Sequence, residues 1–133
     1  KQHFAISRGN YHWKHEPCWY AIRKGKSAKF IGDRTQTTLW EISSLNPAGR
    51  IEERLPHGTQ KPLECMARPI RNHDSELVYD PFLGSGTTLI ACHNLGRRCR
   101  GIEIDLGYVA VTLERFQQHT GLKPVLTSQI SHI

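Results

Sequence analysis

The segment that decides the fold covers residues 76–95 and has the sequence ELVYDPFLGSGTTLIACHNL. Its first five residues form a short apolar run that ends at Asp80, which is typical of a buried strand. The tight turn Gly84-Ser85-Gly86 follows, and from Thr87 apolar residues recur at helical spacing until Gly96. The segment therefore predicts a strand, a glycine loop and a helix, in that order.

The flanking residues extend this pattern into an α/β unit. A helix is expected over residues 62–72, where Pro62 suits a first helical position. A second strand is expected over residues 99–105, with Glu103 at its end, and an amphipathic helix follows over residues 108–116. Alternating strands and helices predict parallel strands joined by a right-handed crossover, as in an open Rossmann-like sheet.

The first part of the chain has a different composition. It is aromatic and basic, with strand-like runs at residues 18–22 and 37–42. The whole net charge of +6 lies in the first 34 residues, which hold eight Lys or Arg against two acids. Such a basic segment is typical of a surface that contacts phosphates, and a solvated face is the alternative. We expect a basic aromatic segment over 1–45, a polar connector over 46–58 and an α/β part over 59–133.

The composition disfavours several other classes of protein. No apolar run approaches the roughly 18 residues that span a bilayer, so we expect no membrane partner. The four cysteines include no C-x-x-C pair, which predicts neither a zinc site nor a disulfide framework and favours a reducing cytoplasm. His12 and His15 do not match H-E-x-x-H, and Pro17 disfavours a helix that carries both. We therefore expect no metal.

The glycine loop lies where open α/β sheets bind ligands, at the carboxyl end of a strand. Glycines let the backbone approach a ligand closely, and the following helix presents unpaired N–H groups. Glu103 stands 17 residues after Gly86, where a carboxylate can accept hydrogen bonds from both ribose hydroxyls of an adenosine. These features fit any adenosine-bearing cofactor, so they leave NAD and S-adenosyl-L-methionine (AdoMet) both open.

Three details favour AdoMet. Leu89 occupies the third glycine position of G-x-G-x-x-G, so the dinucleotide fingerprint is incomplete. No Lys-Ser or Lys-Thr pair follows Gly86, which excludes a P-loop. Asp80 directly precedes the loop, where a carboxylate attracts the amino group and sulfonium of AdoMet but repels a pyrophosphate. Capping of the following helix is the alternative role for Asp80.

Three stretches resemble motifs of the N6-adenine and N4-cytosine DNA methyltransferases. Residues 80–88, DPFLGSGTT, resemble the D-P-F-x-G-S-G-T-T motif of that family. Residues 57–62, HGTQKP, resemble its H-x-T-Q-K-P segment, and residues 101–108, GIEIDLGY, resemble its G-x-E-x-D-x-x-Y motif. The three stretches occur in the family's order and spacing. Residues 11–20 more loosely resemble phage and plasmid modification methylases.

The resemblance implies a partial Rossmann-like methyltransferase sheet that binds AdoMet and donates its methyl group to adenine N6 or cytosine N4 of DNA. Asp80 and the glycine loop would then hold the methionine part of AdoMet, and Glu103 the ribose. For Lys61, which would lie at the carboxylate end, a solvent-facing lysine beside a helix start is the alternative. The expected cofactor-binding residues are Thr59, Gln60, Lys61, Asp80, Phe82, Gly84, Ser85, Gly86, Thr87, Glu103 and Asp105.

DNA is the expected macromolecular partner. Its phosphates would be contacted by five basic residues, namely Arg23, Lys24, Lys26, Lys29 and Arg34. The tryptophans Trp13, Trp19 and Trp40 are expected in the core or in a groove wall rather than as base contacts.

The family's [D/N/S]-P-P-[Y/F/W] motif is absent from this sequence, in which none of the seven prolines are adjacent. In the family its polar group holds the target amino group, and its aromatic ring stacks on the extruded base. Only 28 residues follow Asp105, so we expect the motif upstream of Lys1, in the permuted β-group order. The chain would then be the C-terminal, AdoMet-binding part of the enzyme, without a catalytic residue of its own. A missing N-terminal half, or a second polypeptide, would supply the motif.

Two alternatives to a methyltransferase remain open at this point. One is a catalytically inactive remnant that binds AdoMet or DNA without turnover. The other is a nicotinamide-cofactor-binding domain.

Overall fold

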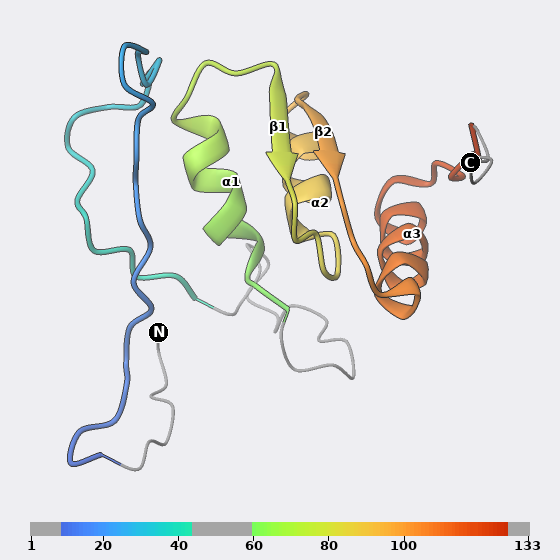
Figure 1. The fold of residues 1–133 in the computed structure, drawn as a ribbon, viewed down its shortest axis with the longest axis horizontal. Helices are drawn as coiled ribbons and strands as arrows, with labels where there is room; N and C mark the ends of the chain where they lie inside the picture. Colours follow the sequence, from blue (N-terminus) through green and yellow to red (C-terminus); the bar gives the residue numbers. More distant parts are fainter. Residues whose placement is uncertain (1–8, 44–59, 128–133) are drawn as a thin grey trace.

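The chain forms an α/β unit around two parallel strands (Figure 1). The computed structural model describes residues 9–43 and 60–127. Its elements follow in the order α1 (Leu63–Arg71), β1 (Leu77–Asp80), α2 (Thr87–Asn94), β2 (Arg98–Gly101) and α3 (Leu106–Thr120). The strands β1 and β2 pair in parallel, with Asp80 opposite Gly101 at their carboxyl ends. The predicted α/β class and the alternation of strands and helices from residue 76 onward are confirmed.

The helix boundaries follow from the residues at their ends. Pro62 is the N-cap of α1, so the helix begins at Leu63, one residue after the predicted start at Pro62. A proline at the N-cap costs no helical hydrogen bond. Asp105 caps α3 by accepting a hydrogen bond from the Tyr108 N–H at 3.1 Å. Gly121 ends α3 with a φ of 74°, in the left-handed region that favours glycine. None of the helices in the described residues is long and apolar enough to cross a membrane.

The strand β2 is shorter than the sequence pattern predicts. Periodicity indicates a strand over residues 99–105, whereas β2 covers Arg98–Gly101, so the prediction that Glu103 ends this strand is wrong. The Ile102 N–H still donates to the carbonyl of Asp80 at 2.9 Å. The Ile102 carbonyl accepts from the Leu83 N–H at 3.0 Å, but Leu83 lies in the loop after β1 and not in a strand. Glu103 therefore lies in the link between β2 and α3.

The core lies on one face of the sheet, where α2 runs behind the strands in the view of Figure 1. Its buried cluster consists of Ile70, Ala91 and Cys92. The partly buried residues packed against this cluster are Leu63, Met66, Ala67, Val78, Leu95 and Cys99. Burial raises the pKa of the Cys92 thiol to about 12, so the sulfur stays protonated and packs as a small apolar group.

The opposite face of the sheet is exposed. Leu77 and Tyr79 of β1 alternate with the inward-facing Val78 and remain 40% and 60% exposed, respectively. Arg98 and Arg100 are likewise exposed on β2. Parallel sheets in proteins are normally covered on both faces, so this sheet has only one of its two usual layers within the described residues.

Residues 9–43 run beside α1, in the blue to teal part of the ribbon (Figure 1). The predicted strand-like runs at 18–22 and 37–42 are wrong, because the structure places neither of them in a strand. In the described residues, an isolated antiparallel bridge pairs Phe30 of this segment with His73, at the end of α1. Aromatic and β-branched residues favour extended backbone, but a strand also needs a partner for its N–H and C=O groups.

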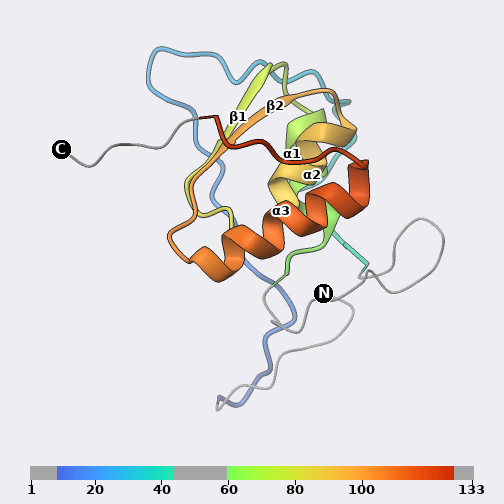
Figure 2. The ribbon, with the colours of Figure 1, turned by 90° about the vertical axis from the view of Figure 1, so that its right-hand side faces the viewer.

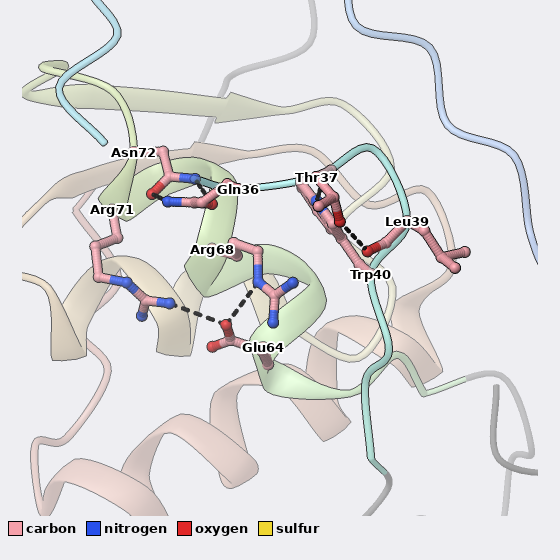
Figure 3. Close-up of polar contacts among 8 residues, drawn as sticks. All are labelled: Gln36, Thr37, Leu39, Trp40, Glu64, Arg68, Arg71 and Asn72. Atoms are coloured by element: carbon pink, nitrogen blue, oxygen red, sulfur yellow. Dashed lines mark hydrogen bonds and ion pairs between the residues drawn. The ribbon is translucent and has the colours of Figure 1, made fainter. Parts of the chain in front are cut away.

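Asn72, at the end of α1, connects this segment to the helix. Its carbonyl accepts hydrogen bonds from the N–H groups of Ile31 and Gly32 at 2.8 and 3.3 Å. Asn72 is buried, with 6% of the residue exposed. Its side-chain amide forms two hydrogen bonds with the Gln36 amide: it donates one at 2.6 Å and accepts one at 3.0 Å (Figure 3). A buried amide paired on both of its polar atoms fixes the position of the segment on α1.

Trp40 provides a second contact with α1. The guanidinium of Arg68 lies over the Trp40 ring at 5.2 Å from its centroid, a cation–π arrangement. The indole N–H donates to the carbonyl of Thr37 at 3.0 Å. Glu64 accepts from both Arg68 and Arg71 at 2.9 Å and so holds the Arg68 guanidinium in place (Figure 3).

Replacing Asn72 by leucine should loosen residues 9–43 from α1. The variant leaves the Gln36 amide without its partner, and the lost buried hydrogen bonds should cost about 1–3 kcal/mol. Limited trypsin digestion should then cleave the variant faster within residues 23–34 than the wild type. The Gln118→Ala variant, altered at an exposed position of α3, is the control and should be digested like the wild type. Equal digestion rates for Asn72→Leu and the wild type would contradict this role of Asn72.

Candidate cofactor-binding site

A cavity of about 370 Å³ opens at the carboxyl ends of β1 and β2. This volume lies in the range of about 300–1,000 Å³ that is usual for small-molecule sites. The predicted residues that line it are Lys61, Asp80, Phe82, Gly84, Ser85, Thr87, Glu103 and Asp105. The further lining residues are Met66, Leu83, Thr88 and Tyr108. Three of these four lie inside the matched motifs, whereas the helical spacing of Met66 indicated only a core position.

The other predicted cofactor residues do not line the cavity. Gly86 is the buried N-cap of α2, with a φ of 78°. A Cβ at this position would lie 2.7 Å from Cγ2 of Thr112, so both the backbone conformation and the contact with α3 require glycine. Gln60 is partly buried outside the lining, and Thr59 lies outside the described residues.

Asp80 is fixed at the end of β1. Its Oδ1 accepts a hydrogen bond from the Phe82 N–H at 3.0 Å, and its Oδ2 accepts from the Thr88 hydroxyl at 2.6 Å. Gly86, not Asp80, caps α2, so the alternative role of Asp80 as a helix cap is wrong. Each carboxylate oxygen keeps a second lone pair, and this partly buried acid is suited to a cationic group in the cavity.

Glu103 connects the link after β2 to the glycine loop. Its Oε2 accepts a hydrogen bond from the Gly84 N–H at 2.7 Å, and its Oε1 accepts from the Asp105 N–H at 2.9 Å. The carboxylate is therefore held in one orientation at the cavity, with lone pairs left for a ligand. Asp105 also lines the cavity, and its carboxylate is at the same time the cap of α3.

Lys61 lies at the cavity and forms an ion pair with Glu16 of the N-terminal segment. The distance from Nζ to Oε2 is 2.7 Å, and the two side chains are 52% and 49% exposed. The backbone carbonyl of Lys61 accepts a hydrogen bond from the Thr87 hydroxyl at 3.3 Å. An exposed ion pair contributes about 0.2–1 kcal/mol, which is small enough for the ammonium to move to another carboxylate.

Helix α3 holds the glycine loop through two side chains that do not line the cavity. The buried Thr112 donates its hydroxyl to the carbonyl of Gly84 at 2.7 Å. Nη1 of Arg115 donates to the carbonyl of Ser85 at 2.9 Å and to Oγ1 of Thr87 at 3.1 Å. Figure 2 shows α3 running alongside this loop. Helical periodicity predicts the apolar face of α3 but gives no signal for these two polar contacts.

The basic segment presents its charges to solvent. All five residues predicted to contact phosphates are exposed, namely Arg23, Lys24, Lys26, Lys29 and Arg34. Trp13 and Trp19 are 54% and 100% exposed, so the prediction that they lie in the core or a groove wall does not hold in the described residues. Trp40 is partly buried against Arg68.

Known proteins of one family are similar to this chain over much of its length. A family model described as "DNA methylase" (N6_N4_Mtase) matches residues 8–114. The type II methyltransferase M2.MboI of Moraxella bovis is 34% identical over 103 residues, which are 76% of this chain and 36% of that protein. M.HpaI of Haemophilus parainfluenzae is 36% identical over 81 residues, which are 59% of this chain and 25% of that protein.

A solved structure also resembles this chain. The crystal structure of the M1.HpyAVI–SAM complex is 31% identical, with a TM-score of 0.57 over 71% of this chain and 46% of that one. The chain spans between 25% and 36% of the length of the two curated relatives above. The family match over most of the sequence shows that this chain belongs to the N6/N4 DNA methyltransferases.

Proposed function

We propose that this chain is the AdoMet-binding part of an enzyme that methylates adenine N6 or cytosine N4 in DNA. The observation that carries the proposal is the pair of fixed carboxylates, Asp80 and Glu103, at one cavity beside the glycine loop. When bound, AdoMet supplies an electrophilic methyl group on its sulfonium. The solved relative that shares this fold is described as a complex with SAM.

The groups at the cavity match AdoMet part by part. Asp80 can pair with the α-amino group, and the free lone pairs of Glu103 can accept from the ribose hydroxyls. The ammonium of Lys61 is available to the methionine carboxylate once it leaves Glu16. A nicotinamide dinucleotide fits less well, because its pyrophosphate would meet the charge of Asp80. We assign the remaining contacts to Phe82, Gly84, Ser85, Thr87 and Asp105, which line the cavity. Contacts of Thr59, Gln60 and Gly86 with the cofactor stay predictions from the sequence.

The Glu103→Gln variant should bind AdoMet about 10- to 150-fold more weakly than the wild type. Loss of a charged acceptor for ribose hydroxyls costs about 1.5–3 kcal/mol, and 1.4 kcal/mol is a tenfold change in affinity. Titration calorimetry with AdoMet and with NAD measures both affinities. The Glu114→Gln variant, with the same change at an exposed position of α3, should bind AdoMet like the wild type. Tighter binding of NAD than of AdoMet would contradict the proposed cofactor.

We propose that the residues that hold the target base belong to a part of the enzyme outside these 133 residues. The sequence has no adjacent prolines, and the chain covers between 25% and 36% of the two curated relatives named above. The exposed sheet face with Leu77 and Tyr79 supports further protein there, since parallel sheets are covered on both faces. Among the described residues β1 pairs only with β2, so its second edge can accept another strand. An N-terminal half, or a second polypeptide, would supply these elements.

The chain alone should not methylate DNA, because its sequence lacks the Pro-Pro motif that holds the target amino group and the extruded base in this family. Tritiated AdoMet and mixed-sequence DNA should give counts at background, and adding the proposed upstream half should restore incorporation. The Tyr79→Asp variant should bind AdoMet normally, but adding the upstream half should not restore its methylation activity. The reason is that the variant places a charge on the sheet face that the upstream half is proposed to cover. The Gln118→Asp variant carries the same added charge on α3, and the upstream half should restore its methylation activity. Clear methylation by the chain alone would show that its catalytic residues lie within these residues.

We further propose that residues 1–45 contact DNA phosphates and that residues 46–58, outside the described residues, connect them to the AdoMet-binding part over 59–133. The five exposed Lys and Arg side chains named above support this role. Three of them flank one turn, in which the Lys26 N–H donates to the carbonyl of Arg23 at 2.9 Å and Gly25 has a φ of 76°. A turn that brings like charges together is suited to a polyanion.

Reversing the charges of Arg23, Lys24 and Lys26 should weaken DNA binding and reduce its dependence on salt. Each phosphate contact contributes a slope of about −0.9 in log K against log salt, so three lost contacts should flatten the slope by about 2.7. Fluorescence anisotropy with a labelled duplex at several salt concentrations measures this slope. Lys123→Glu, a reversal beyond α3, is the control and should leave the slope unchanged. A salt-independent affinity, or a slope that survives the triple reversal, would contradict the proposed contacts.

A further inference from the structure

We propose that Thr112 and Arg115 of α3 are positioning residues that orient the glycine loop toward the cofactor. Neither side chain lines the cavity, yet both donate hydrogen bonds to carbonyl groups of the loop. Because this role rests on the proposed AdoMet site, its test includes a measurement that needs no ligand.

The orientation follows from the planarity of the peptide group. The C=O and N–H of a trans peptide point in opposite directions. Thr112 holds the carbonyl of Gly84, so the N–H of the same peptide, which belongs to Ser85, points away from that hydroxyl. Arg115 holds the next carbonyl, that of Ser85, and the following N–H donates to the carbonyl of Leu83 at 3.0 Å. The Ser85 N–H is therefore the donor of the loop that points away from Thr112, and Ser85 lines the cavity.

Such a constraint is needed because the loop is rich in glycine. Gly84 and Gly86 have φ values of 55° and 78°, and glycine adopts both signs of φ with little difference in energy. A free loop of this composition would sample other orientations of its peptide groups and would lose entropy when a ligand selects one. A loop already held by hydrogen bonds binds without that cost.

Arg115 extends the constraint beyond the loop. It donates to Oγ1 of Thr87 in the first turn of α2, and the Thr87 hydroxyl donates to the carbonyl of Lys61. One side chain of α3 thus connects the loop, the start of α2 and the residue that carries the ammonium at the cavity. The contacts of α3 with the loop are separate from the hydrophobic core. The core cluster and the residues packed against it come from α1, α2, the two strands and Leu95, and none of them belongs to α3.

The test compares variants that remove the donors with variants that keep them. Arg115→Met and Thr112→Val remove the hydrogen-bond donors and keep nearly the same side-chain volume. Arg115→Lys and Thr112→Ser each keep a hydrogen-bond donor at the same position. Titration calorimetry should show AdoMet binding weakened by about tenfold in the first pair, as expected for a lost charge-assisted or buried hydrogen bond, and largely recovered in the second. Gln118→Ala, on the exposed side of the same helix, should bind AdoMet like the wild type.

Two further measurements separate positioning from general stability. In the ligand-free protein, the amide signals of Ser85 and Gly86 in nuclear magnetic resonance spectra should shift in Thr112→Val and Arg115→Met but not in Gln118→Ala. Binding of 5′-methylthioadenosine, which lacks the amino-acid part assigned to the loop, should change less than about twofold. If Arg115→Met fails to fold, Thr112→Val, which exchanges one hydroxyl for a methyl group, provides the same comparison.

The outcomes distinguish this role from the proposed function. Shifted loop signals with unchanged AdoMet affinity would overturn the positioning role, and so would an equal loss of affinity for AdoMet and 5′-methylthioadenosine. Unshifted loop signals in both donor-removing variants would overturn it as well. A wild-type chain that binds no AdoMet would instead contradict the proposed function, while the ligand-free spectra would still report whether α3 orients the loop.

Discussion

The parallel register of β1 and β2 brings the two acids of the candidate site, Asp80 and Glu103, to one cavity. Asp80 lies opposite Gly101, so the two strands end at the same level and the residues that follow them meet at one cavity. Gly101 also leaves room for Leu83, whose side chain would lie 2.7 Å from a Cβ at that position. With this register, the Glu103 carboxylate reaches the Gly84 N–H. A shift by one residue would turn the side chains of a strand to the opposite face and separate the two acids.

Hydrogen bonds hold the glycine loop from two sides, from Glu103 and from helix α3. Glu103 binds the loop on the cavity side and leaves lone pairs there for a ligand. Thr112 and Arg115 bind its carbonyls from α3. Because the loop itself contains two glycines with positive φ, these tertiary contacts, rather than local stiffness, limit its conformations.

The basic segment and the cofactor cavity are connected although they lie far apart in the sequence. Glu16 pairs with Lys61 at the cavity, while Asn72 binds Gln36 at the other end of α1. The ion pair is exposed and weak, whereas the amide pair is partly buried. The segment is therefore fixed at Asn72, and its contact near the cavity can exchange with a ligand carboxylate.

The sequence by itself determined the helices, the glycine loop and the family, because these depend on neighbouring residues. Apolar spacing and the two loop glycines predicted most element boundaries to within a few residues, whereas the cap that Asp105 provides for α3 was not predicted. Only the tertiary structure decided where β2 ends, that residues 18–22 form no strand, and that Thr112 and Arg115 hold the loop. Each of these depends on which distant group is available as a hydrogen-bond partner, and local propensity carries no information about such partners.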